Sequence, residues 1–203
     1  ICCWCRAQAR MRPSKNGLPA GRRRRSVPVP IACHPICGPL RAQVIFSNNG
    51  LADHLPSGSV IILTATIKPA EAAEIYDSLS ERGLSLIDSP VSGGFPGAES
   101  GSLTMMAAGS DTDMKNCSDI MQAVSKTIHH VGEAAPKGQI VKACLQSLIG
   151  SVFSATFEAS VLAAKAGISG QTLFDVFSTS GAGCGVANTA LENIIDRQFE
   201  GTG

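Results

Sequence analysis

Charged side chains are scarce in this chain of 203 residues, at 16%, while hydrophobic residues reach 44%. This balance excludes a disordered or highly charged protein, and the length allows one or two domains with a sizeable core. Acidic residues are absent from residues 1–52, which carry nine of the 17 Lys and Arg residues. Residues 53–203 therefore hold all 16 acids and eight bases, a net charge of about −8, which excludes a globally basic nucleic-acid binder.

Cysteine is also unevenly spread, because five of the eight lie before residue 40. A secreted disulfide scaffold would distribute them along a short chain, so we interpret them as reduced, intracellular thiols. Cys33, His34 and Cys37 suggest zinc only weakly, because a second pair of ligands is missing at the required spacing. We therefore expect no metal site.

Residues 1–40 show no helical or alternating hydrophobic period, and the sequence begins at Ile1. Three interpretations stay open for this Arg/Cys-rich segment: an organellar transit peptide, a nucleic-acid contact built on Arg22–Arg25, or a non-native leader joined to a truncated enzyme. We favour the non-native leader, with which we expect a cytoplasmic protein that binds no nucleic acid. A native leader would indicate an organelle.

From about residue 41 to residue 136, strand and helix patterns alternate. The apolar run 60–63 is typical of a strand that is buried on both faces of a parallel sheet. Pro69 begins a helical pattern that ends at Gly83, and residues 84–87 form the next predicted strand. Further strands are predicted at 103–107 and 127–131, with a helix near 113–125 between them. Such strand–helix–strand units predict an α/β domain with a parallel sheet.

The pattern changes after Pro136, where residues 139–166 form one long, mostly apolar helical pattern that Gly167 ends. Its length would suffice to cross a membrane. Polar side chains that are costly in hydrocarbon interrupt it at Lys142, Gln146, Glu158 and Lys165. We therefore expect no membrane span but the buried centre of an all-α domain, followed by short helices at 173–177 and 191–195.

Residues 88–104 form a loop that is suited to binding a small molecule. It follows a predicted parallel strand, and ligands bind at the carboxyl ends of such strands. Ser92, Gly93 and Gly94 offer a hydroxyl and consecutive backbone N–H groups, a combination that suits a carboxylate. On composition alone, an ordinary glycine-rich turn is the simpler explanation.

Lys142 and Gln146 lie four residues apart and hence on one face of the long helix. Burial would lower the pKa of a lysine, as a general acid/base near neutral pH requires. The alternative is a lysine whose stem lies along the apolar surface while its ammonium reaches water. Thr64 and Thr66, just after the strand at 60–63, contact a cofactor or cap the following helix.

These residues resemble the β-hydroxyacid dehydrogenases, a family that includes 3-hydroxyisobutyrate, tartronate semialdehyde and threonate dehydrogenases and is distantly related to 6-phosphogluconate dehydrogenase. The family motif D-x-P-V-S-G-G, followed by Ala and Gly and then by G-x-L, is complete between Asp88 and Leu103. The resemblance runs from about residue 43 to 203. It implies an NAD(P)-dependent oxidoreductase that acts on the CH–OH group of a small 3-hydroxy acid and is homo-oligomeric when intact.

The resemblance also implies the fold and the role of each site residue. The fold would be a partial Rossmann domain, a doubly wound parallel sheet, over residues 41–136, followed by a truncated all-α domain over residues 137–203. Ser92, Gly93 and Gly94 would bind the substrate carboxylate, Lys142 would be the catalytic lysine, and Thr66 would lie near the nicotinamide of NAD or NADP. Many members carry Asn-Asn where this chain has Leu145 and Gln146. Gln146 keeps an amide for the substrate, as in the branch that acts on threonate and other four-carbon acids.

Two family features are missing. The motif G-x-G-x-x-G, whose helix holds the cofactor pyrophosphate, does not occur in residues 1–52, and the distal helices with a second lysine are absent. We therefore expect a truncated copy of the enzyme. One alternative is a catalytically inactive binding or dimerisation module of the same fold. The other is an Arg-rich nucleic-acid-binding protein, which requires residues 1–40 to be native.

Overall fold

The structure is a computed structural model that describes residues 31–33, without their side chains, and residues 44–199. It divides into two compact units, Ile1–Lys142 and Ala143–Gly203, with the boundary inside the longest helix. Most of the predicted leader, including Arg22–Arg25 and the cysteines before residue 31, lies outside the described residues, as do His34 and Cys37.

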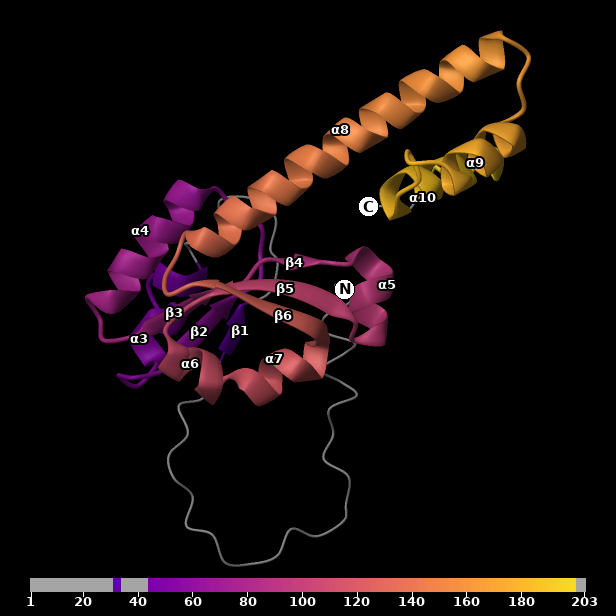
Figure 1. The fold of residues 1–203 in the computed structure, drawn as a ribbon. Coiled ribbons are helices and arrows are strands. Elements are labelled where there is room, and N and C mark those ends of the chain that lie inside the picture. The colour runs from indigo at the N-terminus through magenta and orange to yellow at the C-terminus, as the bar shows by residue number, and fades with distance from the viewer. Residues whose placement is uncertain (1–30, 34–43, 200–203) are drawn as a thin grey trace, which may run out of the picture. The chain divides into compact units, whose positions relative to one another are not determined.

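The first unit contains a six-stranded sheet with helices on both faces (Figure 1). The strands are β1 (Ile31–Cys33), β2 (Val60–Leu63), β3 (Ser85–Asp88), β4 (Val91–Ser92), β5 (Leu103–Ala108) and β6 (Ser125–Gly132). The helices are α3 (Leu51–His54), α4 (Pro69–Ser80), α5 (Gly94–Ser100), α6 (Asp111–Asn116), α7 (Ser118–Val124) and the beginning of α8 (Lys137–Lys165). This architecture confirms the predicted α/β class. The prediction of a loop over 88–104 is wrong, because this segment contains β4 and α5.

The sheet is mixed rather than wholly parallel. β2 and β3 run parallel as predicted, and β1, a strand that the sequence does not predict, runs parallel to β2. However, β5 runs antiparallel to β3 and β4, and β6 runs parallel to β5. The seven residues of α5 span about 10 Å, too little to carry the chain back for a parallel crossover. β5 therefore returns alongside β3 and β4 in one constant register, from Asp88 opposite Ala108 to Ser92 opposite Thr104.

The apolar run of β2 supplies two cores, one on each face of the sheet. Ile61 and Leu63 pack in a core with residues of α4, whereas Val60 and Ile62 pack in a core with residues of α7. Successive side chains of a strand point to opposite faces, so a continuous apolar run fills both. Figure 1 shows α4 on one face and α6 and α7 on the other, which is the doubly wound arrangement that the family resemblance implies.

The helix predicted near 113–125 is two helices, α6 and α7, which meet at Cys117. Ser110 caps the first of them, because its hydroxyl accepts a hydrogen bond from the Asp113 N–H at 3.1 Å. α6 buries no residue, while α7 buries Met121 and Val124. Both helices contribute to the core on this face of the sheet: Cys117 and Met121 are buried in it, and the partly buried Met114 of α6 packs against it.

The second unit contains the rest of α8, then α9 (Gly170–Thr179) and α10 (Gly185–Ile195), both longer than predicted. Gly167 ends α8 with a φ of 77°, as its position predicts. The helix is not the buried centre of its domain that the sequence predicts, because among the described residues nothing covers much of its apolar surface: Leu148, Phe157 and Leu162 are 63%, 48% and 71% exposed. Within the described residues, α8 is also the helix that is long and apolar enough to cross a membrane by length and composition.

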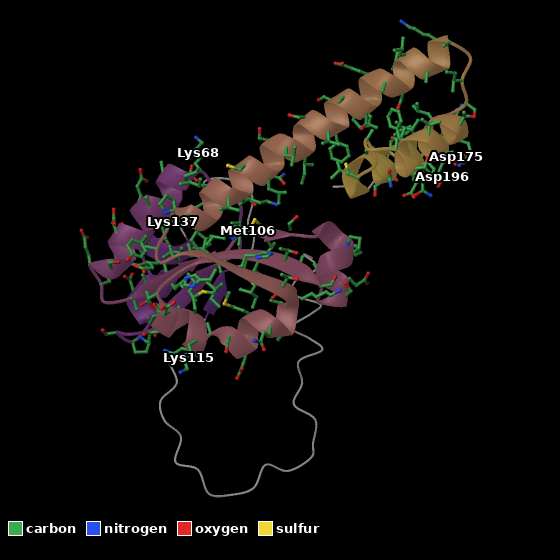
Figure 2. All side chains as sticks on the ribbon, in the orientation of Figure 1. Lys68, Met106, Lys115, Lys137, Asp175 and Asp196 are labelled. Carbon is green, nitrogen blue, oxygen red and sulfur yellow. The ribbon has the colours of Figure 1, made fainter. Side chains whose placement is uncertain are left out.

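α8 starts in very close contact with the sheet at Gly138. A Cβ atom at this position would overlap the carbonyl oxygen of Asp88 and would lie 2.6 Å from that of Met106. Figure 2 shows Met106 on β5 beneath the first turn of α8, where Lys137 marks the start of the helix. Only glycine permits this approach, so Gly138 determines how near α8 lies to β3 and β5.

We predict opposite effects of one substitution at two places in α8. Gly138→Ala should lower the free energy of unfolding by about 1–3 kcal/mol, the usual cost of overpacking a tight contact. Gly150→Ala should raise it by roughly 0.5–1 kcal/mol, because alanine favours a helix interior and no atom lies within 4 Å of the added carbon. Urea denaturation of both variants tests this, and equal effects would contradict the proposed packing of Gly138.

Candidate functional site

Two buried polar side chains join the start of α8 to the end of β3. Asp88 is 0% exposed and Gln139 is 1% exposed. One oxygen of Asp88, Oδ2, accepts a hydrogen bond from the backbone N–H of Gln139 at 3.0 Å, and Oδ1 accepts one from Gln139 Nε2 at 2.8 Å. The carboxyl group thus caps the N-terminus of α8, where a negative charge is favoured.

Burial raises the pKa of Asp88 above its ordinary value, while hydrogen bonds from Gln139 and from the backbone of Gly138 oppose that rise. All of these contacts donate hydrogen bonds to Asp88. A carboxylate accepts on both oxygens, so the surroundings of Asp88 are built for its ionised form despite the burial.

The side chain of Gln139 also holds the segment after β2. Its Nε2 donates to the carbonyl oxygen of Ala65 at 3.0 Å, and its Oε1 accepts from the N–H of Ile67 at 3.0 Å. Thr66 lies between these two backbone groups, and its side chain is exposed. The capping position of α4 is occupied by Lys68, so neither Thr64 nor Thr66 stands at the N-cap of that helix.

Lys142 lies one helical turn after Gln139 and is 7% exposed. Its Nζ donates a hydrogen bond to the carbonyl oxygen of Val91 at 2.8 Å. Burial lowers the pKa of Lys142, and no ion pair recorded among the described residues includes this lysine. The amine is therefore held against β4 in a poorly hydrated place, which favours its neutral, proton-accepting form.

The segment that follows Val91 needs glycine. Gly93 has a φ of 131° and Gly94 a φ of 57°, conformations that residues with a side chain rarely adopt. A Cβ on Gly93 would also lie 3.2 Å from a methyl group of Leu103. Both glycines are exposed and Ser92 is half-buried, so a small ligand can reach their backbone N–H groups and the serine hydroxyl.

The structure brings most of the predicted site residues together within the first unit. Lys142 contacts Val91, the residue directly before Ser92, and Gln139, one turn earlier on α8, holds the segment that contains Thr66. Gln146 lies one turn after Lys142, with an exposed side chain, but it belongs to the second unit. Among the described residues, no group of three His, Cys, Asp or Glu side chains could hold a metal ion.

Sequence reasoning assigned no role to Asp88 or Gln139. Asp88 was noted only as the first residue of the family motif, and Gln139 only as the first residue of the long helical pattern. One signal was available, because Gln139 precedes Lys142 by three residues on the same face of an apolar helix. A second polar side chain on a buried face indicates a hydrogen-bonded partner.

Comparison with known proteins defines first the class of the fold and then its family. The family model for the NAD-binding domain of 6-phosphogluconate dehydrogenase matches residues 38–132, so the first unit has an NAD-binding fold of the Rossmann type. The model described as NAD-binding of NADP-dependent 3-hydroxyisobutyrate dehydrogenase matches residues 136–203. The chain belongs to the β-hydroxyacid dehydrogenase family.

Individual relatives agree with this assignment. An L-threonate dehydrogenase of Escherichia coli is 33% identical over 157 residues, which is 77% of this chain and 52% of that protein. A probable mitochondrial 3-hydroxyisobutyrate dehydrogenase of Dictyostelium discoideum is 33% identical and is matched over 44% of its length by 70% of this chain. The crystal structure of a 3-hydroxyisobutyrate dehydrogenase from Salmonella typhimurium has a TM-score of 0.70 at 31% identity, covering 77% of this chain and 54% of that one. The chain thus spans about half the length of the curated relatives it matches.

The buried lysine predicts a pH-dependent stability. Because burial lowers the folded-state pKa of Lys142, the unfolded chain binds this proton more tightly than the folded chain. The cost of burying the ammonium is present in full below the folded-state pKa, and stability rises as the pH increases from there to the ordinary lysine pKa. Lys142→Met should remove this rise, so the variant should gain most over the parent at the low end of that interval.

Urea unfolding of the parent and the variant from neutral to alkaline pH measures this difference. Lys165→Met, at an exposed position of the same helix, is the control and should leave the pH profile parallel to that of the parent. A parallel profile for Lys142→Met as well would show that the lysine is not buried in solution.

Proposed function

We propose that this chain supplies the substrate end of an NAD(P)-dependent dehydrogenase that oxidises the hydroxyl group of a small 3-hydroxy acid. The observation that carries the proposal is the hydrogen bond between Lys142 Nζ and Val91 O. It holds a proton acceptor next to Ser92, Gly93 and Gly94, the segment that suits a carboxylate. A 3-hydroxy acid has a carboxylate and a hydroxyl group separated by two carbon atoms, so it suits two adjacent sites of this kind.

The site residues of the first unit each have a definite role in this reaction. The Ser92 hydroxyl and the N–H groups of Gly93 and Gly94 bind the carboxylate and so orient the substrate. The neutral amine of Lys142 accepts the hydroxyl proton in the direction of oxidation and returns it in the direction of reduction. The Val91 carbonyl accepts a hydrogen bond from the amine or the ammonium, so it holds Lys142 in place in both protonation states.

NAD or NADP supplies the hydride acceptor when bound. The exposed Thr66 follows the carboxyl end of β2, the place where folds of this class bind their ligands, so it fits the nicotinamide end of the dinucleotide. The matched families are described as NAD-binding, which supports the same assignment. Our proposal concerns the nicotinamide end of the dinucleotide.

For the substrate we propose a four-carbon hydroxy acid such as threonate. Gln146 takes the place of the second asparagine of many family members and keeps an amide one turn beyond Lys142. Several relatives at 30–33% identity are named L-threonate dehydrogenase, which supports this substrate class.

The test is oxidation of L-threonate, 3-hydroxyisobutyrate and L-serine with NAD and with NADP, by this chain and by any longer protein that contains it. Lys142→Arg should lower turnover by about two to four orders of magnitude, because arginine hardly ever releases its proton. Cofactor affinity should stay unchanged. Lys165→Arg, a matched change on an exposed turn of α8, should leave turnover at the parent level. Normal turnover with Lys142→Arg would refute the acid/base role.

A second candidate function is association with another copy of the chain, which the exposed apolar side chains of the second unit favour. Phe157, Val161 and Leu162 line a hollow on α8 and are 48%, 56% and 71% exposed. The ring of Phe157 also stacks on that of Phe153, with 5.8 Å between the ring centroids. So many large apolar side chains on one helix mark an interface.

Association predicts a particle larger than a monomer. Light scattering after size-exclusion chromatography should show oligomers of the parent, and Val161→Glu with Leu162→Glu should shift them to monomers. Ser151→Glu, at an exposed polar position of the same helix, is the control that should not. A monomeric parent at high concentration would rule out this candidate.

A further inference from the structure

The first turns of α8 are held to the sheet mainly by polar contacts. Of its first six residues, Gly138, Gln139 and Lys142 are buried, whereas Ile140 and Val141 are 47% and 38% exposed. The two apolar side chains therefore contribute little of the packing that usually docks a helix. Lys142 is also the last residue of α8 within the first unit, so its position depends on the contacts that hold the first turns of the helix to the sheet.

Gln139 supplies the largest share of those polar contacts. Its side-chain amide makes three hydrogen bonds, to the Ala65 carbonyl, the Ile67 N–H and the Asp88 carboxylate. These bonds require two donors and one acceptor on a single planar group, which only an amide side chain of this length provides. Because every one of these groups is buried, leaving any of them unpaired would be costly.

We infer that Gln139 is a positioning residue for Lys142: its amide holds the Ala65–Ile67 segment, the end of β3 and the first turns of α8 as one rigid unit. The inference rests on the proposed function for its catalytic meaning, because it places the proton acceptor Lys142 at a constant position relative to Thr66. The hydrogen bonds of Gln139 to this segment are made with the backbone groups of Ala65 and Ile67, on either side of Thr66, so Gln139 acts through the backbone.

Amide hydrogen exchange of the unmodified chain tests the rigid unit. The Ile67 N–H is held by Gln139 Oε1, and the Gln139 N–H is held by Asp88 Oδ2. If the Ala65–Ile67 segment and the first turn of α8 open together, the Ile67 and Gln139 amides should show the same opening equilibrium constant. An Ile67 amide that exchanges much faster than the Gln139 amide would overturn the inference.

The variant Gln139→Met tests the effect on the lysine. Methionine keeps the length and approximate volume of the side chain but makes none of the three hydrogen bonds. In the folded variant, the Ile67 amide should lose its protection, while that of Ala72, bonded within α4, should keep it. The pKa of Lys142, measured by NMR of side-chain-labelled lysine, should rise toward that of an exposed lysine because the amine gains access to water.

The matched control is Gln171→Met, because the Gln171 amide also donates to an aspartate, Asp175, at 2.8 Å, but on an exposed face of α9. It should leave the Lys142 titration unchanged. A folded Gln139→Met variant whose Lys142 titrates as in the parent would overturn the inference. If this variant does not fold, the hydrogen-exchange comparison in the parent decides alone.

Neither measurement needs a cofactor or turnover, so their failure is distinguishable from failure of the proposed dehydrogenase activity. Where a protein containing this chain is active, Gln139→Met should lower kcat by about 100-fold, the cost of a small misplacement of a reacting group. The KM for the hydroxy acid should change little, because the hydrogen bonds of Gln139 are made with Ala65, Ile67 and Asp88 rather than with the carboxylate-binding segment 92–94. An equal effect on both constants would indicate a merely structural role.

Discussion

The buried hydrogen bonds between Asp88 and Gln139 are the constraint on which the rest of the candidate site depends. They join the end of β3 to the start of α8, and the further hydrogen bonds of Gln139 to Ala65 and Ile67 add the segment after β2. The contact is close because residue 138 has no side chain, which lets the helix end approach two strand carbonyls. With this turn of α8 in place, Lys142 is buried against Val91, close in sequence to Gly93 and Gly94, which both adopt positive φ.

Much of the fold could be predicted from local patterns. The run 60–63 indicated a strand buried on both faces, and β2 contributes to both cores. Pro69 and Gly167 marked the start of one helix and the end of another. The direction of β5 could not be predicted, because a strand pattern has no direction. The short α5 determines it, since it cannot return the chain for a parallel crossover.

The candidate site was predictable where a motif marked it and not where distant contacts built it. Ser92, Gly93, Gly94 and Lys142 stood out by residue type and by resemblance to the family. The roles of Asp88 and Gln139 depend on contacts across 51 and 74 residues of sequence, which no local pattern reveals. Their importance follows from burial, because a buried carboxyl group and a buried amide must satisfy one another.

The most direct test of this account is an NMR titration of the isotope-labelled chain with L-threonate. The account predicts saturable shifts of the Gly93 and Gly94 amides and of the Lys142 side chain, which together bind the carboxylate and the hydroxyl group. An analogue that lacks the 3-hydroxyl group should shift the NMR signals of the two glycine amides but not those of the Lys142 side chain. Shifts that are absent from these residues, or that occur only in α9 and α10, would contradict the assignment of the site.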